Sequence, residues 1–217
     1  MENKQAPVIT IDGPAGSGKG TIATMLAQHL GWQLLDSGAI YRVAAQAALE
    51  AKLALDDADS LVTLIQNLEM RFEKGKVWRN GQDVSLAIRT PEAADATSRI
   101  STLPAVRAAL MDRQRAFRQL PGLVADGRDM GTVVFPDAKL KVFLTASPEI
   151  RAERRLKQLS EQGIYASIAA LIEEIKERDE RDSNRSIAPL RPAADALLID
   201  SSQLSPKQVL HLILQNQ

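Results

Sequence analysis

The stretch Ile9–Thr21, with the sequence ITIDGPAGSGKGT, decides which fold the rest of the chain must build. It begins with a short apolar run, and Gly13–Lys19 follows with the spacing G-x-x-x-x-G-K. A flexible linker would not lie between an apolar strand and an amphipathic helix, and a tight turn needs one glycine and no lysine. The stretch therefore predicts a loop whose backbone N–H groups surround a phosphate, at the junction of a strand and a helix.

The helix expected after this loop, Lys19–Leu30, strengthens the phosphate interpretation. Ile22, Leu26 and Leu30 recur every four residues and give the helix an apolar face. The first turn of such a helix carries positive potential, and Lys19 can reach the β- and γ-phosphates of a nucleotide. We therefore expect a nucleotide as the ligand, with its phosphates bound by Gly13, Pro14, Ala15, Gly16, Ser17, Gly18, Lys19, Gly20 and Thr21.

Position 20 departs from the usual form of the motif, which has Ser or Thr directly after the lysine. Gly20 stands there, so the hydroxyl partner of a Mg²⁺ ion could be Thr21 or Ser17, or water could take its place. Asp126 also follows an apolar run and could hold Mg²⁺ through water, as an aspartate does in many proteins with this loop. Switch GTPases are disfavoured because the chain contains neither an Asn-Lys-x-Asp nor an Asp-x-x-Gly pattern.

The composition limits what else the chain can be. Its 217 residues suit one large domain or a core with insertions, and 27 Lys and Arg balance 27 Asp and Glu. A chain without net charge has no overall field for duplex nucleic acid, so we expect no nucleic-acid partner. Since the chain has no cysteine and two histidines, disulfides, thiolate zinc sites and histidine-rich metal sites are excluded.

The apolar segments are too short for targeting or for membrane insertion. The N-terminus, MENKQAPVITID, lacks the long apolar centre of a signal peptide. No later run reaches the roughly 18 apolar residues that a membrane span needs. We therefore expect a cytoplasmic protein without membrane contact. No long apolar stripe demands a partner, so a monomer is expected.

Short apolar runs and helix-like segments alternate along most of the chain. Ser147-Pro148 and Ser205-Pro206 each start a helix, with serine as the cap and proline in the first position. The alternation predicts an α/β fold of the P-loop NTPase type, with a five-stranded parallel sheet flanked by helices. The expected strands are Val8–Ile11, Gln33–Leu35, Leu123–Ala125, Lys141–Leu144 and Ala196–Ile199, and further helices are Pro148–Leu159, Ile168–Arg181 and Pro206–Leu214.

The middle of the chain breaks this alternation. Leu68–Ile88 consists of short alternating segments, and Asn80-Gly81 is a strong signal for a two-residue hairpin. We expect a small antiparallel β insertion of two or three strands, followed by a helix starting at Thr90–Ala94 and another over Pro104–Leu120. The chain would then be one domain, 1–217, with a core of 1–66 and 120–217 and an insertion of about 67–119.

Polar residues follow two of the expected strands, at the sheet edge where open α/β folds bind ligands. Ser37 and Arg42 follow the second strand and place a hydroxyl, a helix N-terminus and a guanidinium together. Arg128 and Asp129 follow the third strand, in a loop with two glycines. We expect these residues to form part of a ligand site, although Ser37 could also serve only as a helix cap.

Charged residues are frequent on two later helices. Arg151, Arg154 and Arg155 share one helix face, where like charges repel unless an anion binds or water solvates them. Phosphoryl transfer would use such arginines, because positive charge on the equatorial oxygens stabilises its transition state. Since water must be excluded, we expect a helical lid at about 154–166, with Gly163 as a hinge candidate. A second charged group consists of Arg178, Asp182 and Arg185.

Together these segments resemble the bacterial-type cytidylate kinase family over nearly the whole chain. The resemblance rests on TIDGPAGSGKGT, LLDSGAIYR, ADGRDMGTVVFPDA, IKERDERDSNR and PLRPAADALLIDSS, and on the antiparallel insertion before IRTPE. It implies that ATP phosphorylates CMP and dCMP to CDP and dCDP, with Mg²⁺ as the cofactor and the insertion as the acceptor-binding part. The sequence GKGT is also the variant that is typical of nucleoside monophosphate kinases.

The resemblance also implies roles for individual residues. The catalytic residues would be Lys19, Arg128, Arg154 and Arg178. Ser37, Arg42 and Arg128 would lie at the acceptor, with the two arginines near its phosphate, while the cytosine would be surrounded by Ser98, Arg107 and Asp129. The sugar would contact Asp182 and Arg185, and Arg185 would also lie close to the phosphate. The candidates for holding Mg²⁺, through water, are Thr21 and Asp126.

Hydrogen-bonding chemistry favours cytosine at such a site. A carboxylate or hydroxyl can accept from the exocyclic amine of cytosine. Uracil has a carbonyl there, which would leave a buried group unpaired at a cost of about 1–3 kcal/mol. Two alternatives stay open: a kinase for another small acceptor, such as UMP, AMP or shikimate, and a nucleotide-binding module without turnover. The number of arginines argues against the second alternative.

Overall fold

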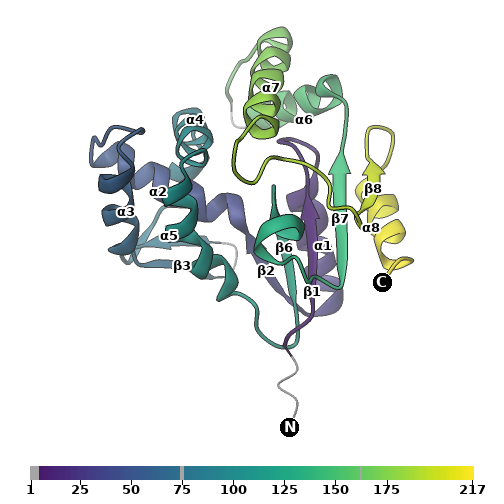
Figure 1. Cartoon of the computed structure of the whole chain (residues 1–217). Coiled ribbons are helices and arrows are strands. Elements are labelled where there is room, and N and C mark those ends of the chain that lie inside the picture. The colour runs from purple at the N-terminus through teal and green to yellow at the C-terminus, as the bar shows by residue number, and fades with distance from the viewer. Residues whose placement is uncertain (1–4, 74–75, 162) are drawn as a thin grey trace. The chain divides into compact units, whose positions relative to one another are not determined.

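The computed structural model describes residues 5–73, 76–161 and 163–217. The chain forms two compact units (Figure 1). The first unit combines Met1–Leu35 with Phe117–Gln217, and the second is Asp36–Ala116. The glycine-rich loop therefore belongs to the first unit.

A five-stranded sheet forms the centre of the first unit (Figure 1). Its strands are β1 Val8–Asp12, β2 Gln33–Asp36, β6 Leu123–Gly127, β7 Leu140–Thr145 and β8 Leu197–Asp200. Their order is β2-β6-β1-β7-β8, and the pairs β1–β6, β1–β7 and β7–β8 are parallel. Ile11 lies opposite Asp126, and Asp12 lies opposite Gly127, so β1 and β6 end at the same edge. The predicted sheet is thus confirmed.

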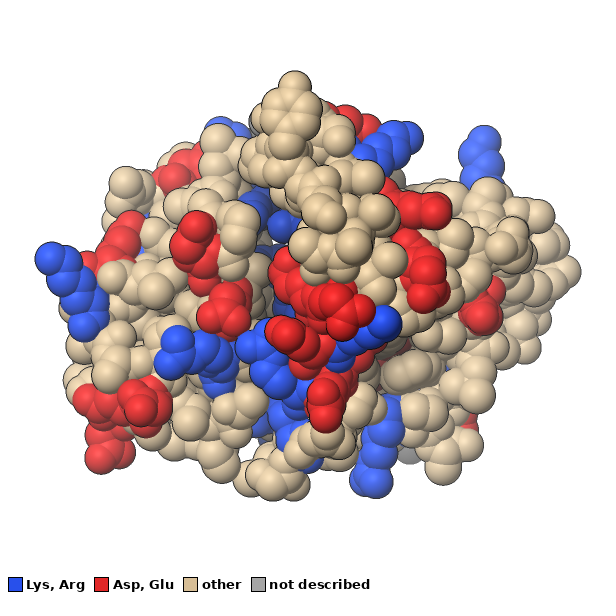
Figure 2. Space-filling view, turned by 90° about the horizontal axis from the view of Figure 1, so that it is seen from above, with Lys and Arg blue, Asp and Glu red and all other residues tan. Residues whose placement is uncertain are grey.

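The surface carries both signs of charge. Acidic and basic side chains are interspersed on the face seen from above in Figure 2. Acidic side chains gather near the middle of this face, with basic side chains next to them (Figure 2). None of the helices within 5–73, 76–161 and 163–217 combines the length and the apolar character needed to span a membrane.

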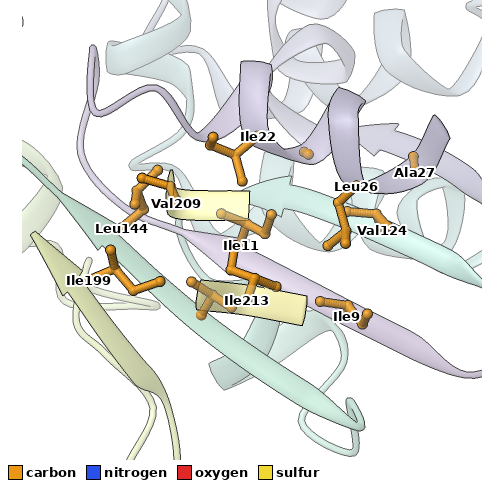
Figure 3. Close-up of a cluster of buried hydrophobic side chains, with 12 residues drawn as sticks. Ile9, Ile11, Ile22, Leu26, Ala27, Val124, Leu144, Ile199, Val209 and Ile213 are labelled. Carbon is orange, nitrogen blue, oxygen red and sulfur yellow. The ribbon is translucent and has the colours of Figure 1, made fainter. Parts of the chain in front are cut away.

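Helices α1 (Lys19–Leu30) and α8 (Pro206–Leu214) pack together with the sheet around one hydrophobic core. Ile22 and Leu26 of α1 and Val209 and Ile213 of α8 surround Ile11 of β1 (Figure 3). All five side chains are at most 2% exposed. Burial of apolar surface stabilises this arrangement by about 25 cal/mol per Å². The core fixes the position of α1 and therefore the direction in which its N-terminus points.

Helices α6 (Pro148–Glu161) and α7 (Ile168–Ser183) pack on each other at the end of the first unit. In the connection between them, Gly163 has a φ of 75°, and the N–H of Ile164 donates to the carbonyl of Leu159 at 2.9 Å. Most of the predicted lid, about 154–166, is therefore the second half of α6. Residue 162 of this lid lies outside the described residues, and the lid function stays a prediction. The buried cluster between the helices contains Ala152, Leu159, Leu171 and Ile175.

The second unit combines four helices with a small antiparallel sheet. Its helices are α2 (Ser37–Glu50), α3 (Ala58–Gln66), α4 (Pro91–Ile100) and α5 (Pro104–Arg115). Helix α2 packs against the other three, and α3 also packs against α5. The sheet consists of β3 (Met70–Glu73), β4 (Lys76–Arg79) and β5 (Gln82–Asp83), followed by the short 3₁₀ helix η1 (Ala87–Arg89). The predicted antiparallel insertion is confirmed, although its residues 74–75 lie outside the described residues.

The hairpin between β4 and β5 has the predicted two-residue turn. Asn80 has a φ of 47° and Gly81 a φ of 79°, as a type I′ turn requires. A Cβ at Gly81 would meet no atom within 4 Å, so a side chain there would be unfavourable only because of the positive φ. We expect Gly81→Ala to lower the free energy of unfolding in urea by about 1 kcal/mol. If the variant is as stable as the wild type, position 81 does not need a residue that readily adopts the left-handed backbone conformation.

Helix α5 is shorter than predicted. It ends at Arg115 and not at Leu120, and Ala116 is its C-cap. The reason is that the chain enters the first unit, where the Arg118 guanidinium donates to the Ala6 carbonyl at 2.8 Å and pairs with Asp137.

The compact units also divide the chain elsewhere than expected. The second unit begins at Asp36, whereas the predicted insertion begins at about 67. Helices α2 and α3 belong to it because they pack against α4 and α5. The sequence does not predict α3, whose buried residues are only Leu61 and Ile65. The interpretation of 1–217 as one functional domain stays a prediction.

Candidate active site

The glycine-rich loop joins β1 to α1 and ends at a helix N-terminus that no side chain caps. Gly18 is the N-cap, with a φ of 91°. Since the first N–H groups of a helix lack intrahelical acceptors, this terminus suits an anion. Lys19 Nζ donates to the carbonyl of Pro14 at 3.1 Å, so the ammonium lies over the loop. Gly13 has no room for a side chain, because a Cβ would lie 2.0 Å from the carbonyl oxygen of Leu144.

Two arginines of α6 hold carbonyl groups of this loop. Arg151 donates to the carbonyl of Ala15 at 3.1 Å, and Arg154 donates to the carbonyl of Ser17 at 3.1 Å. The C=O and N–H groups of a peptide point in opposite directions. When these carbonyls are held on one side of the loop, the N–H groups of the same peptides point to the other side. An anion would be bound on that other side.

Both arginines also have other partners within the first unit. Arg151 is 3% exposed and forms a bidentate pair with Asp179 of α7. This pairing, and not an anion or water alone, balances its charge on the crowded helix face. Arg154 also donates to the carbonyl of Ser201 at 2.7 Å. Contact between Arg154 and the transferring phosphate stays a prediction.

The carboxylate of Asp126 lies beside the glycine at position 20. A Cβ on Gly20 would lie 3.2 Å from Oδ2 of Asp126, which is closer than side chains normally approach. Asp126 is 7% exposed near the end of β6, so it has little freedom to move away. A larger residue would therefore require a shift of a few tenths of an ångström between the two groups. The structure thus brings Asp126 beside the helix N-terminus at which Thr21 is exposed.

Asp182 of α7 joins two of the predicted arginines. Its Oδ2 accepts from Arg128 Nε at 2.8 Å, and its Oδ1 accepts from Arg185 at 2.7 Å. Burial raises the pKa of Asp182, but the charges of Arg128 and Arg185 outweigh this effect and hold the pKa below its ordinary value. The charge of Arg178 also lowers this pKa, so it acts on the same carboxylate. These four residues form one charged cluster.

Asp12, the last residue of β1, is not among the predicted site residues. It is 5% exposed, and its carboxylate accepts from the backbone N–H groups of Met130 and Gly131, each at 2.8 Å. Burial raises its pKa to about 7 against the lowering effect of these two bonds. The nearby charges of Asp129 and Asp126 raise it further. Its place between an apolar strand and the glycine loop is the sequence signal that could have indicated it.

In the second unit, Ser37 and Arg42 lie in the first turns of α2. The cap of this helix is Asp36, whose Oδ1 accepts from the N–H of Ala39 at 2.8 Å and whose Oδ2 pairs with Arg42 at 2.8 Å. Ser37 Oγ instead donates to the side-chain oxygen of Gln114 on α5 at 2.7 Å. The alternative that Ser37 is only a helix cap is therefore wrong.

Ser98 of α4 and Arg107 of α5 belong to the same unit. Ser98 is 4% exposed, and its Oγ has no hydrogen-bond partner among the described residues. A buried hydroxyl without a partner costs about 1–3 kcal/mol. Ser98 is thus suited to a polar group that the chain does not supply. Arg107 donates to the carbonyl of Ser101 at 3.1 Å, and its guanidinium lies 5.8 Å from the centre of the Tyr41 ring.

The predicted residues therefore fall into two sets, one in each unit. In the first unit they are Gly13–Thr21, Asp126, Arg128, Asp129, Arg154, Arg178, Asp182 and Arg185, and in the second they are Ser37, Arg42, Ser98 and Arg107. Asp12, Asp36 and Gln114 support them and were not predicted. Arg151, which was named only as part of a charged helix face, also supports them. For Gln114 no local pattern exists, because its partner is 77 residues away.

A parallel sheet whose first strand leads through a glycine-rich loop into a helix defines this chain as a P-loop protein that binds nucleotide phosphates. The sequence model of the family described as cytidylate kinase matches residues 9–217. The chain belongs to the cytidylate kinase family.

Individual proteins are similar over the same length. The cytidylate kinase of Aeromonas hydrophila is 56% identical over 215 residues, with 97% of this chain and 94% of that protein covered. The cytidylate kinase of Pseudomonas putida is 56% identical over 217 residues, with coverage of 97% and 95%. A solved structure of an uncharacterised protein from Eubacterium ventriosum is similar in fold alone, with 13% identity, 97% coverage of each chain and a TM-score of 0.50.

Proposed function

We propose that this chain transfers the γ-phosphoryl group of ATP to CMP, forming ADP and CDP, and that it also accepts dCMP. The observation that carries this function is the 56% identity to a cytidylate kinase over 97% of the chain. The geometry agrees with it, because the glycine loop suits the phosphates of a nucleotide donor and the charged cluster around Asp182 suits a second anion. A binding module without turnover would not need this second set of cations.

The donor's phosphates would lie on the loop Gly13–Thr21, with Lys19 on the β- and γ-phosphates. Transfer in line needs little covalent chemistry from the protein, since it depends on positioning and on positive charge at the transferring group. Arg128, Arg154 and Arg178 would supply this charge. Arg128 is already held by Asp182, so part of its orientation is set before substrate binds.

The residues that would bind the acceptor are those to which the family resemblance assigns this role. Ser37, Arg42 and Arg128 would hold the CMP phosphate side, with Arg185 nearby. Asp182 and Arg185 would bind the sugar, and the base would be bound by Ser98, Arg107 and Asp129. The buried, unpartnered hydroxyl of Ser98 supports its role, because the cytosine amine or carbonyl would satisfy it.

Mg²⁺ is the ion expected with ATP, and the residues present fit it. Asp126 and Thr21 offer oxygen atoms, the donors that Mg²⁺ prefers, and Ser17 Oγ is buried without a hydrogen-bond partner among the described residues. That part of the chain contains no group of three or more His, Cys, Asp or Glu arranged for a metal. Water and phosphate oxygens would therefore complete the shell, and the bound ion would neutralise charge on the β- and γ-phosphates.

The function is tested by measuring ADP formation with ATP and Mg²⁺ against a panel of acceptors. CMP and dCMP should give acceptor-dependent ADP, whereas UMP, AMP and shikimate should give much less. No ADP formation with CMP would refute the proposal. Gel filtration of the same sample tests the expected monomer, and the cytoplasmic location stays a prediction.

Asp129→Ala should reduce kcat/KM for CMP more than kcat/KM for UMP. Asp129 is 4% exposed, and its carboxylate would accept from the cytosine amine, which uracil lacks. Loss of one hydrogen bond to a charged group corresponds to about 1.5–3 kcal/mol, or roughly 10- to 150-fold for CMP. Equal losses with both acceptors, in steady-state assays, would remove Asp129 from base selection.

A further inference from the structure

We propose that Asp12 is a positioning residue for base recognition: its carboxylate holds the turn that carries Asp129 and thereby sets the preference for cytosine. The inference rests on the proposed function, in which Asp129 lies at the base. Asp12 would act without touching the acceptor, because both of its oxygen atoms bind backbone N–H groups of this turn.

The turn after β6 is a single π-helical turn, η2 (Met130–Val134), with Asp129 as its N-cap. The Asp129 carbonyl accepts from the N–H groups of Val133 and Val134 at 2.9 and 3.2 Å. Turns of this width are rare and occur frequently at functional sites. The Asp129 side chain makes no cap hydrogen bond to the turn that follows it. The start of η2 must therefore be held by another part of the chain.

Asp12 provides the cap that is missing from the local sequence. The N–H groups at the start of a helical turn have no acceptor within the turn. Here those of Met130 and Gly131, the first two residues of η2, donate to the two carboxylate oxygens of Asp12, each at 2.8 Å. Asp12 is itself fixed as the last residue of the central strand β1, between β6 and β7. The strand that leads into the glycine loop thus also anchors the turn at Asp129.

Close packing makes the turn sensitive to its anchor. A Cβ on Gly131 would lie 2.7 Å from Thr10 Oγ1, and a Cβ on Gly127 would lie 2.7 Å from Cγ of Met130. At Gly131 the backbone of η2 therefore packs closely on Thr10 of β1, and the Met130 side chain packs closely on Gly127 of β6. Because Asp129 directly precedes Met130, a displaced η2 would move the Asp129 backbone.

The glycine loop depends on other contacts. Its carbonyls are held by Arg151 and Arg154, and Gly13 is confined by the carbonyl of Leu144. None of these bonds includes the Asp12 side chain. A change at Asp12 is therefore expected to affect the acceptor more than ATP.

Two variants test this role. Asp12→Asn keeps the shape of the side chain, but its amide has only one acceptor oxygen. The NH₂ group would face the second backbone N–H and could not accept from it. Asp12→Glu keeps the charge but shifts the carboxylate by one methylene. Both should raise KM for CMP and lower the ratio of kcat/KM for CMP over UMP, each by about tenfold, as expected for a loss near 1.4 kcal/mol. KM for ATP should change less than about threefold, because the bonds that hold the glycine loop do not include the Asp12 side chain. A tenfold change would correspond to a loss of about 1.4 kcal/mol in ATP binding.

Val209→Ala serves as the matched control, because it creates a cavity in the core around α1 and α8 without touching η2. It should lower thermal stability and leave the ratio of CMP to UMP use unchanged. If it lowers that ratio as much as Asp12→Asn does, the effect is general destabilisation and the proposal is wrong. If Asp12→Glu behaves like the wild type, the charge alone matters and positioning is refuted.

A measurement on the unaltered protein completes the test. The amides of Met130 and Gly131 should exchange slowly with solvent in the wild type, and rapid exchange of both would overturn the proposal even if the variants fail to fold. An inactive wild type would refute the proposed function. An active wild type whose Asp12 variants keep KM and selectivity for CMP would refute only this inference.

Discussion

Lys19→Met should lower kcat for CMP phosphorylation by about a thousandfold, the scale on which one preorganised charge contributes to such reactions. Methionine is similar in length to lysine and lacks the ammonium that would lie on the β- and γ-phosphates. The backbone of the loop is held by Arg151 and Arg154, so nucleotide binding should weaken far less than turnover. Steady-state ADP formation and nucleotide titration measure the two effects separately.

Lys207→Met is the matched control for this experiment. Lys207 lies exposed in the first turn of α8, and it is not among the residues assigned to the site. Its replacement makes the same chemical change near another helix N-terminus and should leave kcat unchanged. If Lys19→Met retains kcat within about tenfold of the wild type, which corresponds to about 1.4 kcal/mol, the ammonium is not a catalytic group.

Asp182→Asn should lower the free energy of unfolding by about 3–5 kcal/mol, as is typical when one partner of a buried ion pair is removed. The side chains of Asp182 and Arg185 are 6% and 4% exposed, and that of Arg128 is 18% exposed. Without the carboxylate, the two guanidinium groups would face each other with no opposite charge between them. Urea denaturation measures the loss, and KM for CMP should rise because the same carboxylate is assigned to the sugar.

Asp195→Asn provides the comparison for a pair at the surface. Asp195 binds Lys141 at 2.9 Å, but its side chain is 65% exposed. Water can replace such a partner, so the variant should be nearly as stable as the wild type. If Asp182→Asn were equally harmless, the cluster around Asp182 would not contribute to stability.

The same cluster predicts a dependence on acid. The pKa of Asp182 is lower in the folded chain than its ordinary value of 3.8, because the charges of Arg128 and Arg185 outweigh burial. Its contribution to stability is therefore present above pH 3.8 and is lost as the pH falls through the folded-state pKa. The difference in stability between the wild type and Asp182→Asn should narrow as the pH is lowered below 3.8. A difference that stays constant in urea titrations at each pH would contradict this assignment.

Short-range patterns were sufficient for most of the fold. The start and end of α1, the hairpin at Asn80-Gly81 and the Ser205 cap of α8 all follow from residues within a few positions of one another. Such features depend on local backbone preferences and on apolar spacing, and both can be read directly from a sequence. Helix α3 was not predicted, although Asp57 caps it and its buried residues Leu61 and Ile65 are four residues apart.

The candidate site was predictable where motifs contain its residues. The glycine loop and the charged residues after β6 and on α7 were identified in this way. Their partners were not, since Asp12 and Met130 are 118 residues apart and Arg151 and Asp179 are 28 apart. No local preference links such residues.

The sequence by itself determined that a strand, a glycine-rich loop and a helix would form a phosphate site, because glycine spacing and apolar periodicity act over one or two turns of backbone. Only the tertiary structure decided what surrounds that site. Strand β6 brings the carboxylate of Asp126 beside position 20, and η2 is capped by Asp12 because β1 ends beside it. Both contacts depend on which strands become neighbours, and this is decided when the sheet and its core pack together.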